Sequence, residues 1–122
     1  MNALSPASRA ARRACAREAR DAFPAMGVYA IRDRDSGRVL LGVSRNVPAA
    51  LNRARFELRM RSHADRMLQA AWEQGGPERL AFEVLELVKE RDDPAFDYAG
   101  ELKALEAFHR EALAEAAGAD HA

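Results

Sequence analysis

Several features are scarce in this chain of 122 residues, and each shortage excludes a class of protein. The single cysteine, Cys15, cannot form an internal disulfide and has no second cysteine for a zinc site, so we expect it to pack as a small residue. No apolar run approaches the roughly 20 residues of a membrane-spanning helix, and the arginine-rich N-terminus lacks the apolar core of a signal peptide. The length predicts one domain, and without a membrane span or a signal peptide we expect it in the cytoplasm.

Two kinds of cofactor motif are also missing. No glycine-rich loop opens a helix in a way that would cradle a nucleotide. His109 and His121, with the acids near them, do not have a zinc-binding spacing. The sequence therefore offers no sign of a nucleotide cofactor or a zinc ion.

The formal net charge is zero, but the charges are separated along the chain. Residues 1–79 carry 15 arginines against 8 acidic residues, whereas residues 80–122 carry 4 basic residues against 11 acidic ones. The basic part could supply a surface that faces phosphate, and the acidic part could hold a cation. Solvated helix faces explain the same pattern, and the sequence leaves both interpretations open.

Strand patterns occupy three segments. Residues 27–34 and 38–44 alternate apolar and polar side chains around Asp35-Ser36-Gly37, whose glycine suits a hairpin turn, so they predict an antiparallel pair. Residues 80–88 (LAFEVLELV) are rich in β-branched and aromatic residues and predict a third strand.

Helical patterns occupy four segments. Residues 7–22 predict a basic helix that Pro24 ends, and residues 48–60 predict a second helix with Leu51, Ala54 and Leu58 on one face. In a third helix, over residues 64–74, Ser62 and Asp65 are predicted to form a capping pair. Its packing face is predicted to comprise Met67, Leu68, Ala71 and Trp72. The fourth helix, over residues 100–116, has an apolar stripe of Leu102, Leu105, Phe108, Ala112 and Leu113.

This order of elements predicts an α+β fold, a small three-stranded antiparallel sheet flanked by helices. Residues 1–25 are expected to hold the extra basic N-terminal helix, residues 26–116 the folded domain, and residues 117–122 a disordered tail.

Residues 27–42 (GVYAIRDRDSGRVLLG) carry a family resemblance. Gly27, Val28 and Tyr29 stand where GIY-YIG nucleases have Gly-Ile-Tyr, and residues 40–42 (LLG) stand where they have Tyr-Ile-Gly. The likeness extends over residues 26–113 through Ser62-His63, Leu68-Gln69 and Trp72. The segment LNRARF at residues 51–56 is similar to one in small single-domain bacterial members.

The resemblance implies an endonuclease that hydrolyses DNA phosphodiester bonds with one divalent cation, Mg²⁺ or Mn²⁺. Glu106 matches the metal-binding glutamate, with Glu101 as the fallback, and an ion pair between Glu106 and Arg110 is the plain alternative. Tyr29 matches the tyrosine that orients the attacking water, and His63 matches a histidine that relays a proton or contacts phosphate.

Two positions depart from the family pattern. Leu40 replaces the second motif tyrosine, and Ala50 stands where the family arginine is expected. Arg53, one helical turn further on, and Arg55 are the nearest candidates for a phosphate clamp, and Arg53 lies on nearly the same helix face as residue 50. The predicted nucleic-acid contacts are Arg45, Arg53, Arg55 and Arg59.

Two functions follow from these departures. The chain is a nuclease whose activity the substitutions reduce, or it is a module with the same fold that binds nucleic acid or a protein partner without cutting it. The basic N-terminal helix could also serve as an interaction arm.

Overall fold

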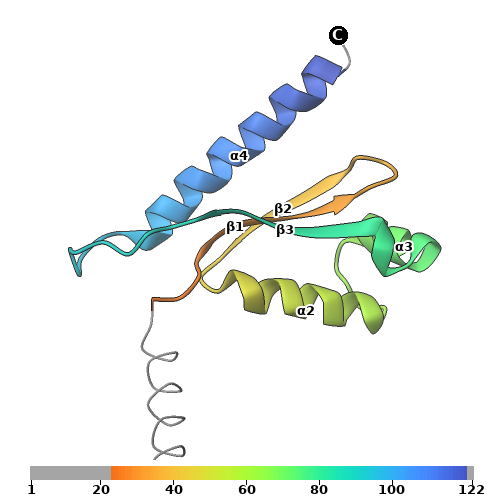
Figure 1. The fold of residues 1–122 in the computed structure, drawn as a ribbon, viewed down its shortest axis with the longest axis horizontal. Coiled ribbons are helices and arrows are strands. Elements are labelled where there is room, and N and C mark those ends of the chain that lie inside the picture. Colours follow the sequence, from red (N-terminus) through yellow and green to blue (C-terminus); the bar gives the residue numbers. More distant parts are fainter. Residues whose placement is uncertain (1–22, 121–122) are drawn as a thin grey trace, which may run out of the picture.

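The computed structural model describes residues 23–120, so the predicted helix over residues 7–22, Cys15 and His121 lie outside the described part. The described elements are β1 (Gly27–Asp33), β2 (Val39–Ser44), α2 (Val47–Arg59), α3 (Arg66–Gly75), the short 3₁₀ helix η1 (Pro77–Arg79), β3 (Leu80–Leu87) and α4 (Tyr98–Asp120). They form a three-stranded antiparallel sheet flanked by helices, which confirms the predicted α+β fold (Figure 1).

The strands lie in the order β2-β1-β3, and both neighbours run antiparallel to β1. Gly37 has a φ of +79° in the predicted turn between β1 and β2, a conformation that glycine adopts without steric cost. Tyr29 lies opposite Gly42 on one side and Val84 on the other, and Ile31 lies opposite Leu40. Because paired residues point to the same face of a sheet, this register places Tyr29, Ile31 and Leu40 on one face.

Helices α2 and α3 cover that face, whereas α4 crosses the opposite face (Figure 1). Leu51, Ala54 and Leu58 are buried against the sheet, which confirms the predicted apolar face of α2. The main core lies in this layer and consists of Ile31, Val47, Leu51, Ala54, Leu58, Leu68, Ala71 and Leu80.

The opposite face has a smaller core, in which Leu102 of α4 packs with Met26 and Val88. The C-terminal end of α4 extends past the sheet (Figure 1). Within the predicted stripe, Leu113 is half-buried, whereas Phe108 is 63% exposed. The helix begins at Tyr98 and continues to Asp120. It therefore includes residues 117–120, which the sequence predicts to be part of a tail. Neither α4 nor any other helix within residues 23–120 is long and apolar enough to cross a membrane.

The predicted capping pair of α3 is wrong. Asp65 itself caps the helix by accepting the Leu68 N–H at 3.0 Å, and α3 therefore starts at Arg66. The Ser62 hydroxyl instead donates to the carbonyl oxygen of Glu57 at the end of α2. On the packing face, Leu68 and Ala71 are buried as predicted, whereas Met67 is 64% exposed.

Candidate active site

Three of the predicted site residues line one cleft between the β1–β2 pair and α2. The cleft has a volume of about 470 Å³, and we call it the Tyr29 cleft. Tyr29 comes from β1, Arg53 from α2, and His63 from the loop between α2 and α3. The complete lining is Tyr29, Ile31, Leu40, Val43, Ser44, Asn46, Ala49, Ala50, Arg53, Ala54, Glu57 and His63.

The phenol of Tyr29 crosses β2 directly over Gly42. A β-carbon at residue 42 would lie 2.5 Å from both the hydroxyl oxygen and Cζ of Tyr29, so only glycine leaves room for the ring there. Burial raises the pKa of Tyr29, and the negative charges of Glu106 and Glu57 raise it further. The phenol is therefore neutral near pH 7 and serves as a hydrogen-bond donor rather than as a phenolate base.

A chain of hydrogen bonds fixes His63. The backbone N–H of Asp65 donates to His63 Nδ1 at 3.0 Å, so the neutral ring carries its proton on Nε2. The backbone N–H of His63 donates to Gln69 Oε1 at 3.1 Å, and Gln69 Nε2 donates to the Leu58 carbonyl at 3.0 Å. The buried Gln69 thus ties α3 to the end of α2 and to the His63 loop. The sequence places Gln69 beside Leu68, but it gives no sign of this role.

The structure separates the two arginines that the sequence left as candidates. Arg53 lines the cleft, and its side chain is 80% exposed with Nε 3.5 Å from Glu57 Oε2. The Arg55 guanidinium lies instead over the ring of Phe82, 4.3 Å from its centre. Glu57, which was not predicted as a site residue, is a carboxylate within the cleft. The sequence indicates its position only through the spacing of four residues from Arg53, which places both side chains on the same face of the helix.

The other two predicted nucleic-acid contacts lie outside the cleft. Arg45 is exposed in the loop between β2 and α2, and Arg59 is exposed at the last position of α2. Neither of them lines the cleft. Their contact with nucleic acid stays a prediction.

Glu106 projects from α4, on the other side of the sheet, and does not line the Tyr29 cleft. It is half-buried, and its Oε2 accepts a hydrogen bond from Arg110 Nη2 at 3.2 Å, which is the ion pair that was the plain alternative. Its charge nevertheless acts on Tyr29, since it raises the pKa of that phenol. The fallback Glu101 lies elsewhere, beside Leu87 and Lys89.

Within residues 23–120, no group of three or more histidine, cysteine, aspartate or glutamate side chains could enclose a metal ion. A structural zinc or a protein-caged calcium site needs such a group. Mg²⁺ usually keeps several water ligands and needs only one or two carboxylates together with substrate phosphate. Glu106 therefore fits a cation of this kind, which takes one or two protein carboxylates.

Leu40 and Ala50 both line the Tyr29 cleft. The hydroxyl and the guanidinium that the family resemblance leads us to expect at these positions are therefore missing from the cleft itself. Arg53 is the arginine that lines the cleft, whereas no described side chain of the lining supplies a second phenol.

No protein-family model and no curated protein matches the sequence significantly. Among solved structures, the chain is similar to the catalytic domain of the homing endonuclease I-TevI, with a TM-score of 0.58 and 19% identity over 72% of this chain and 87% of that one. A mutant catalytic domain of the intron endonuclease I-TevI gives a TM-score of 0.48 and 21% identity over 66% of this chain and 82% of that one. The predicted resemblance is thus confirmed at the level of structure, and the chain has the fold of a GIY-YIG homing endonuclease catalytic domain.

Proposed function

We propose that the Tyr29 cleft hydrolyses phosphodiester bonds of DNA and that the protein is a metal-dependent endonuclease. One observation carries this proposal: Tyr29 of β1, Arg53 of α2 and His63 of the following loop line the same cleft. The similarity of the fold to a homing endonuclease catalytic domain supports the same reaction class.

The cleft offers donors for a phosphate group. The exposed guanidinium of Arg53 can bind two phosphate oxygens at once, and such paired, charge-assisted hydrogen bonds are among the strongest. His63 has its proton on Nε2 because Nδ1 accepts from the backbone, so His63 donates to phosphate rather than taking up a proton at Nδ1. The neutral phenol of Tyr29 orients the attacking water by a hydrogen bond.

Hydrolysis also requires an acceptor for the proton of the attacking water. Among the side chains that line the cleft in the described part of the chain, Glu57 supplies the carboxylate. It lies near enough to Tyr29 to raise the pKa of the phenol, and its ion pair with Arg53 is long at 3.5 Å. Glu57 is therefore the group that we assign as proton acceptor.

Glu106 would hold the divalent cation, Mg²⁺ or Mn²⁺. Such a cation, when bound, neutralises the negative charge that develops on the phosphoryl group. Arg110 competes for the same carboxylate, because it already donates to Glu106 Oε2. A cation that binds here displaces an exposed ion pair, whose contribution to stability is small.

A second candidate function is binding of nucleic acid without cleavage. Leu40 and Ala50 favour it, since both line the cleft without a polar side chain. Loss of one group that stabilises a transition state lowers the rate by about 100-fold to 1,000-fold. Two such losses would leave a slow enzyme or a binding module.

A cleavage assay on the full chain tests the proposal. Supercoiled and single-stranded DNA are incubated with the protein in Mg²⁺ or Mn²⁺, with EDTA as the metal-free control. We expect cleavage that EDTA abolishes, that Glu106→Gln also abolishes, and that Glu115→Gln leaves unchanged, because Glu115 is an exposed residue of the same helix.

Two results would contradict it. Salt-sensitive binding without any cleavage in either metal would establish the binding module instead. Equal cleavage by wild type and Glu106→Gln would refute the assignment of the metal-binding residue.

A further inference from the structure

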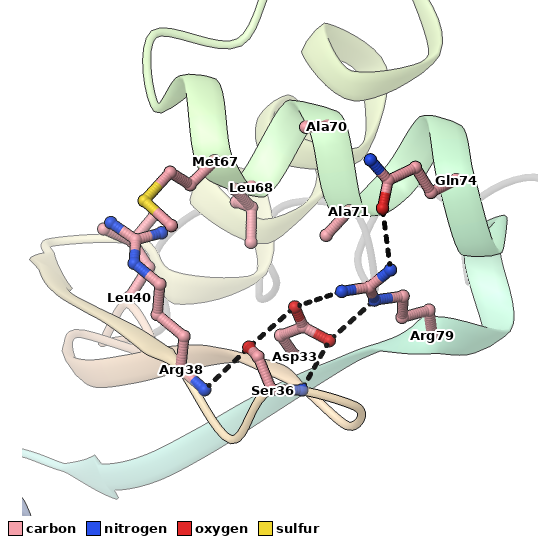
Figure 2. Close-up of a pocket in the computed structure, with 10 residues that line it drawn as sticks. All are labelled: Asp33, Ser36, Arg38, Leu40, Met67, Leu68, Ala70, Ala71, Gln74 and Arg79. Carbon is pink, nitrogen blue, oxygen red and sulfur yellow. Dashed lines mark hydrogen bonds and ion pairs between the residues drawn. The ribbon is translucent and has the colours of Figure 1, made fainter.

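A second cavity of about 220 Å³ lies between the β1–β2 turn and α3 (Figure 2). We call it the α3 cavity. Its apolar wall comes mainly from one helix, through Met67, Leu68, Ala70 and Ala71. Its polar groups are spread around the rim: Gln74 of α3 lies beside Arg79, and the Arg38 guanidinium lies on the other side, near Met67 (Figure 2). The cavity therefore combines an apolar helix surface with separate hydrogen-bonding groups at its rim.

The α3 cavity adjoins the Tyr29 cleft. Leu40 lines both, so its side chain is the partition between them. A second connection runs through Asp65, whose carboxylate accepts from Arg38 Nη1 and Nη2 at 3.1 and 3.2 Å and whose N–H donates to His63. A ligand that occupies the cleft thus has the α3 cavity next to it, across one leucine.

The charges around the α3 cavity are already paired. Asp33 is buried and accepts from Arg79 Nε and Nη2 at 2.8 and 2.9 Å and from the Ser36 hydroxyl at 2.8 Å. Arg38 pairs with Asp65. A site with compensated charges is poorly suited to a free anion, because a phosphate needs an excess of positive charge.

Two hydrogen-bonding groups nevertheless remain at the rim, the uncharged amide of Gln74 and the exposed part of the Arg38 guanidinium. Gln74 accepts from Arg79 Nη1 at 3.3 Å through Oε1, which leaves its amide nitrogen pointing away from that bond (Figure 2). The Arg38 side chain is 41% exposed. These donors could meet the oxygen and nitrogen acceptors at the edge of a planar heterocycle.

We propose that the α3 cavity binds one unstacked nucleobase of the strand whose phosphate lies in the Tyr29 cleft. The inference rests on the proposed function of that cleft and adds a substrate class to it. A nucleobase has apolar faces and polar edges, which match the helix wall and the Gln74 end of the cavity. A base leaves its stack at less cost in a single strand than in a duplex, so the protein prefers single-stranded or locally unpaired DNA.

Binding measurements in EDTA test the inference on the full chain without cleavage. The probes are a short labelled single strand and the same strand with its bases removed, and fluorescence anisotropy gives both dissociation constants. Wild type should bind the strand with bases on the order of tenfold more tightly. In Ala70→Leu the added side chain fills the cavity, and this preference should disappear while affinity for the base-free strand is kept.

The matched control is Ala104→Leu, the same change at an exposed position of α4 that lines neither the α3 cavity nor the Tyr29 cleft. It should behave as wild type. Circular dichroism checks that each variant folds, and Gln74→Ala, which removes the edge amide, should lower the preference for bases if Ala70→Leu does not fold.

Equal wild-type affinity for the two strands, or a preference that Ala70→Leu and Gln74→Ala leave intact, would overturn the inference. If DNA is still cleaved in the metal-containing assay, the proposed function survives that result. Failure to bind either strand together with absence of cleavage would overturn both.

Discussion

Replacing Gln69 by leucine should destabilise the protein and release His63. Gln69 is buried, and its amide bridges the Leu58 carbonyl and the His63 N–H, at 3.0 and 3.1 Å. Leucine fills a similar space but can make neither hydrogen bond. The Leu58 carbonyl keeps a bond from the Arg61 N–H at 3.2 Å, whereas the His63 N–H loses its acceptor.

The expected cost follows from these contacts. The His63 N–H is partly buried, and an interior donor that is left without a partner costs about 1–3 kcal/mol in the free energy of unfolding. For a domain of this size, about 4 °C in the thermal midpoint corresponds to each kcal/mol, so the midpoint should fall by roughly 4–12 °C. Cleavage should fall as well at temperatures where the variant is fully folded, because His63 is no longer held at the cleft.

Gln74→Leu is the matched control, since it makes the same substitution on the same helix at an exposed position. Its amide accepts only a solvent-exposed bond from Arg79, so the change should alter the free energy of unfolding by less than about 0.5 kcal/mol. Urea and thermal denaturation give the free energy of unfolding and the thermal midpoint of the two variants. Equal stabilities of Gln69→Leu and Gln74→Leu would refute the idea that Gln69 anchors the His63 loop.

Three further changes have definite expected outcomes. Gly42→Ala should push the phenol of Tyr29 aside and lower the cleavage rate by about 100-fold at unchanged fold by circular dichroism, and an unaltered rate would contradict the close contact. The hydrogen bonds from Arg79 hold the pKa of Asp33 well below its usual range, so its stabilising contribution is present above about pH 4 and is lost as the pH falls below that value. The thermal midpoint of wild type should therefore decline more steeply below about pH 4 than that of Asp33→Asn, and parallel pH profiles would refute this. Leu58→Ala, at a fully buried core position, should cost about 2–5 kcal/mol in urea denaturation, and a cost below about 1 kcal/mol would place Leu58 outside the core.

Local patterns were sufficient to predict the strands and most helices. Alternation around Asp35-Ser36-Gly37 predicts the hairpin, and the spacing of Leu51, Ala54 and Leu58 predicts the buried face of α2. The start of α3 was not predictable in this way. It depends on how α2 ends. Arg61 adopts a φ of +58° there, and the Ser62 hydroxyl donates to the Glu57 carbonyl of α2 and does not cap α3.

The exposed part of α4 has a similar explanation. Phe108 was placed on the apolar stripe and is 63% exposed, whereas its neighbour His109 faces the sheet and bonds Glu86 of β3. Periodicity along the sequence could not show which side of α4 is turned toward the sheet. Long-range pairs such as Asp33 with Arg79, which are 46 residues apart, carry no local signal either.

The candidate site was only partly predictable. Motif spacing indicates Tyr29 and His63, and helix geometry favours Arg53 over Arg55, in agreement with where the side chains lie. Glu57 was not predicted as a site residue, because a glutamate four residues after an arginine is common on solvated helices. Only the packing of α2 on the sheet shows that this pair faces the phenol of Tyr29.

Single-turnover cleavage of DNA by Arg53→Ala and Arg66→Ala tests the central claim most directly. Both changes remove an exposed arginine from a helix, but only Arg53 lines the Tyr29 cleft. If the cleft hydrolyses phosphodiester bonds, Arg53→Ala should lower the rate by about 100-fold to 1,000-fold, whereas Arg66→Ala should leave it unchanged. Equal rates for the two variants would contradict the claim that the Tyr29 cleft is the active site.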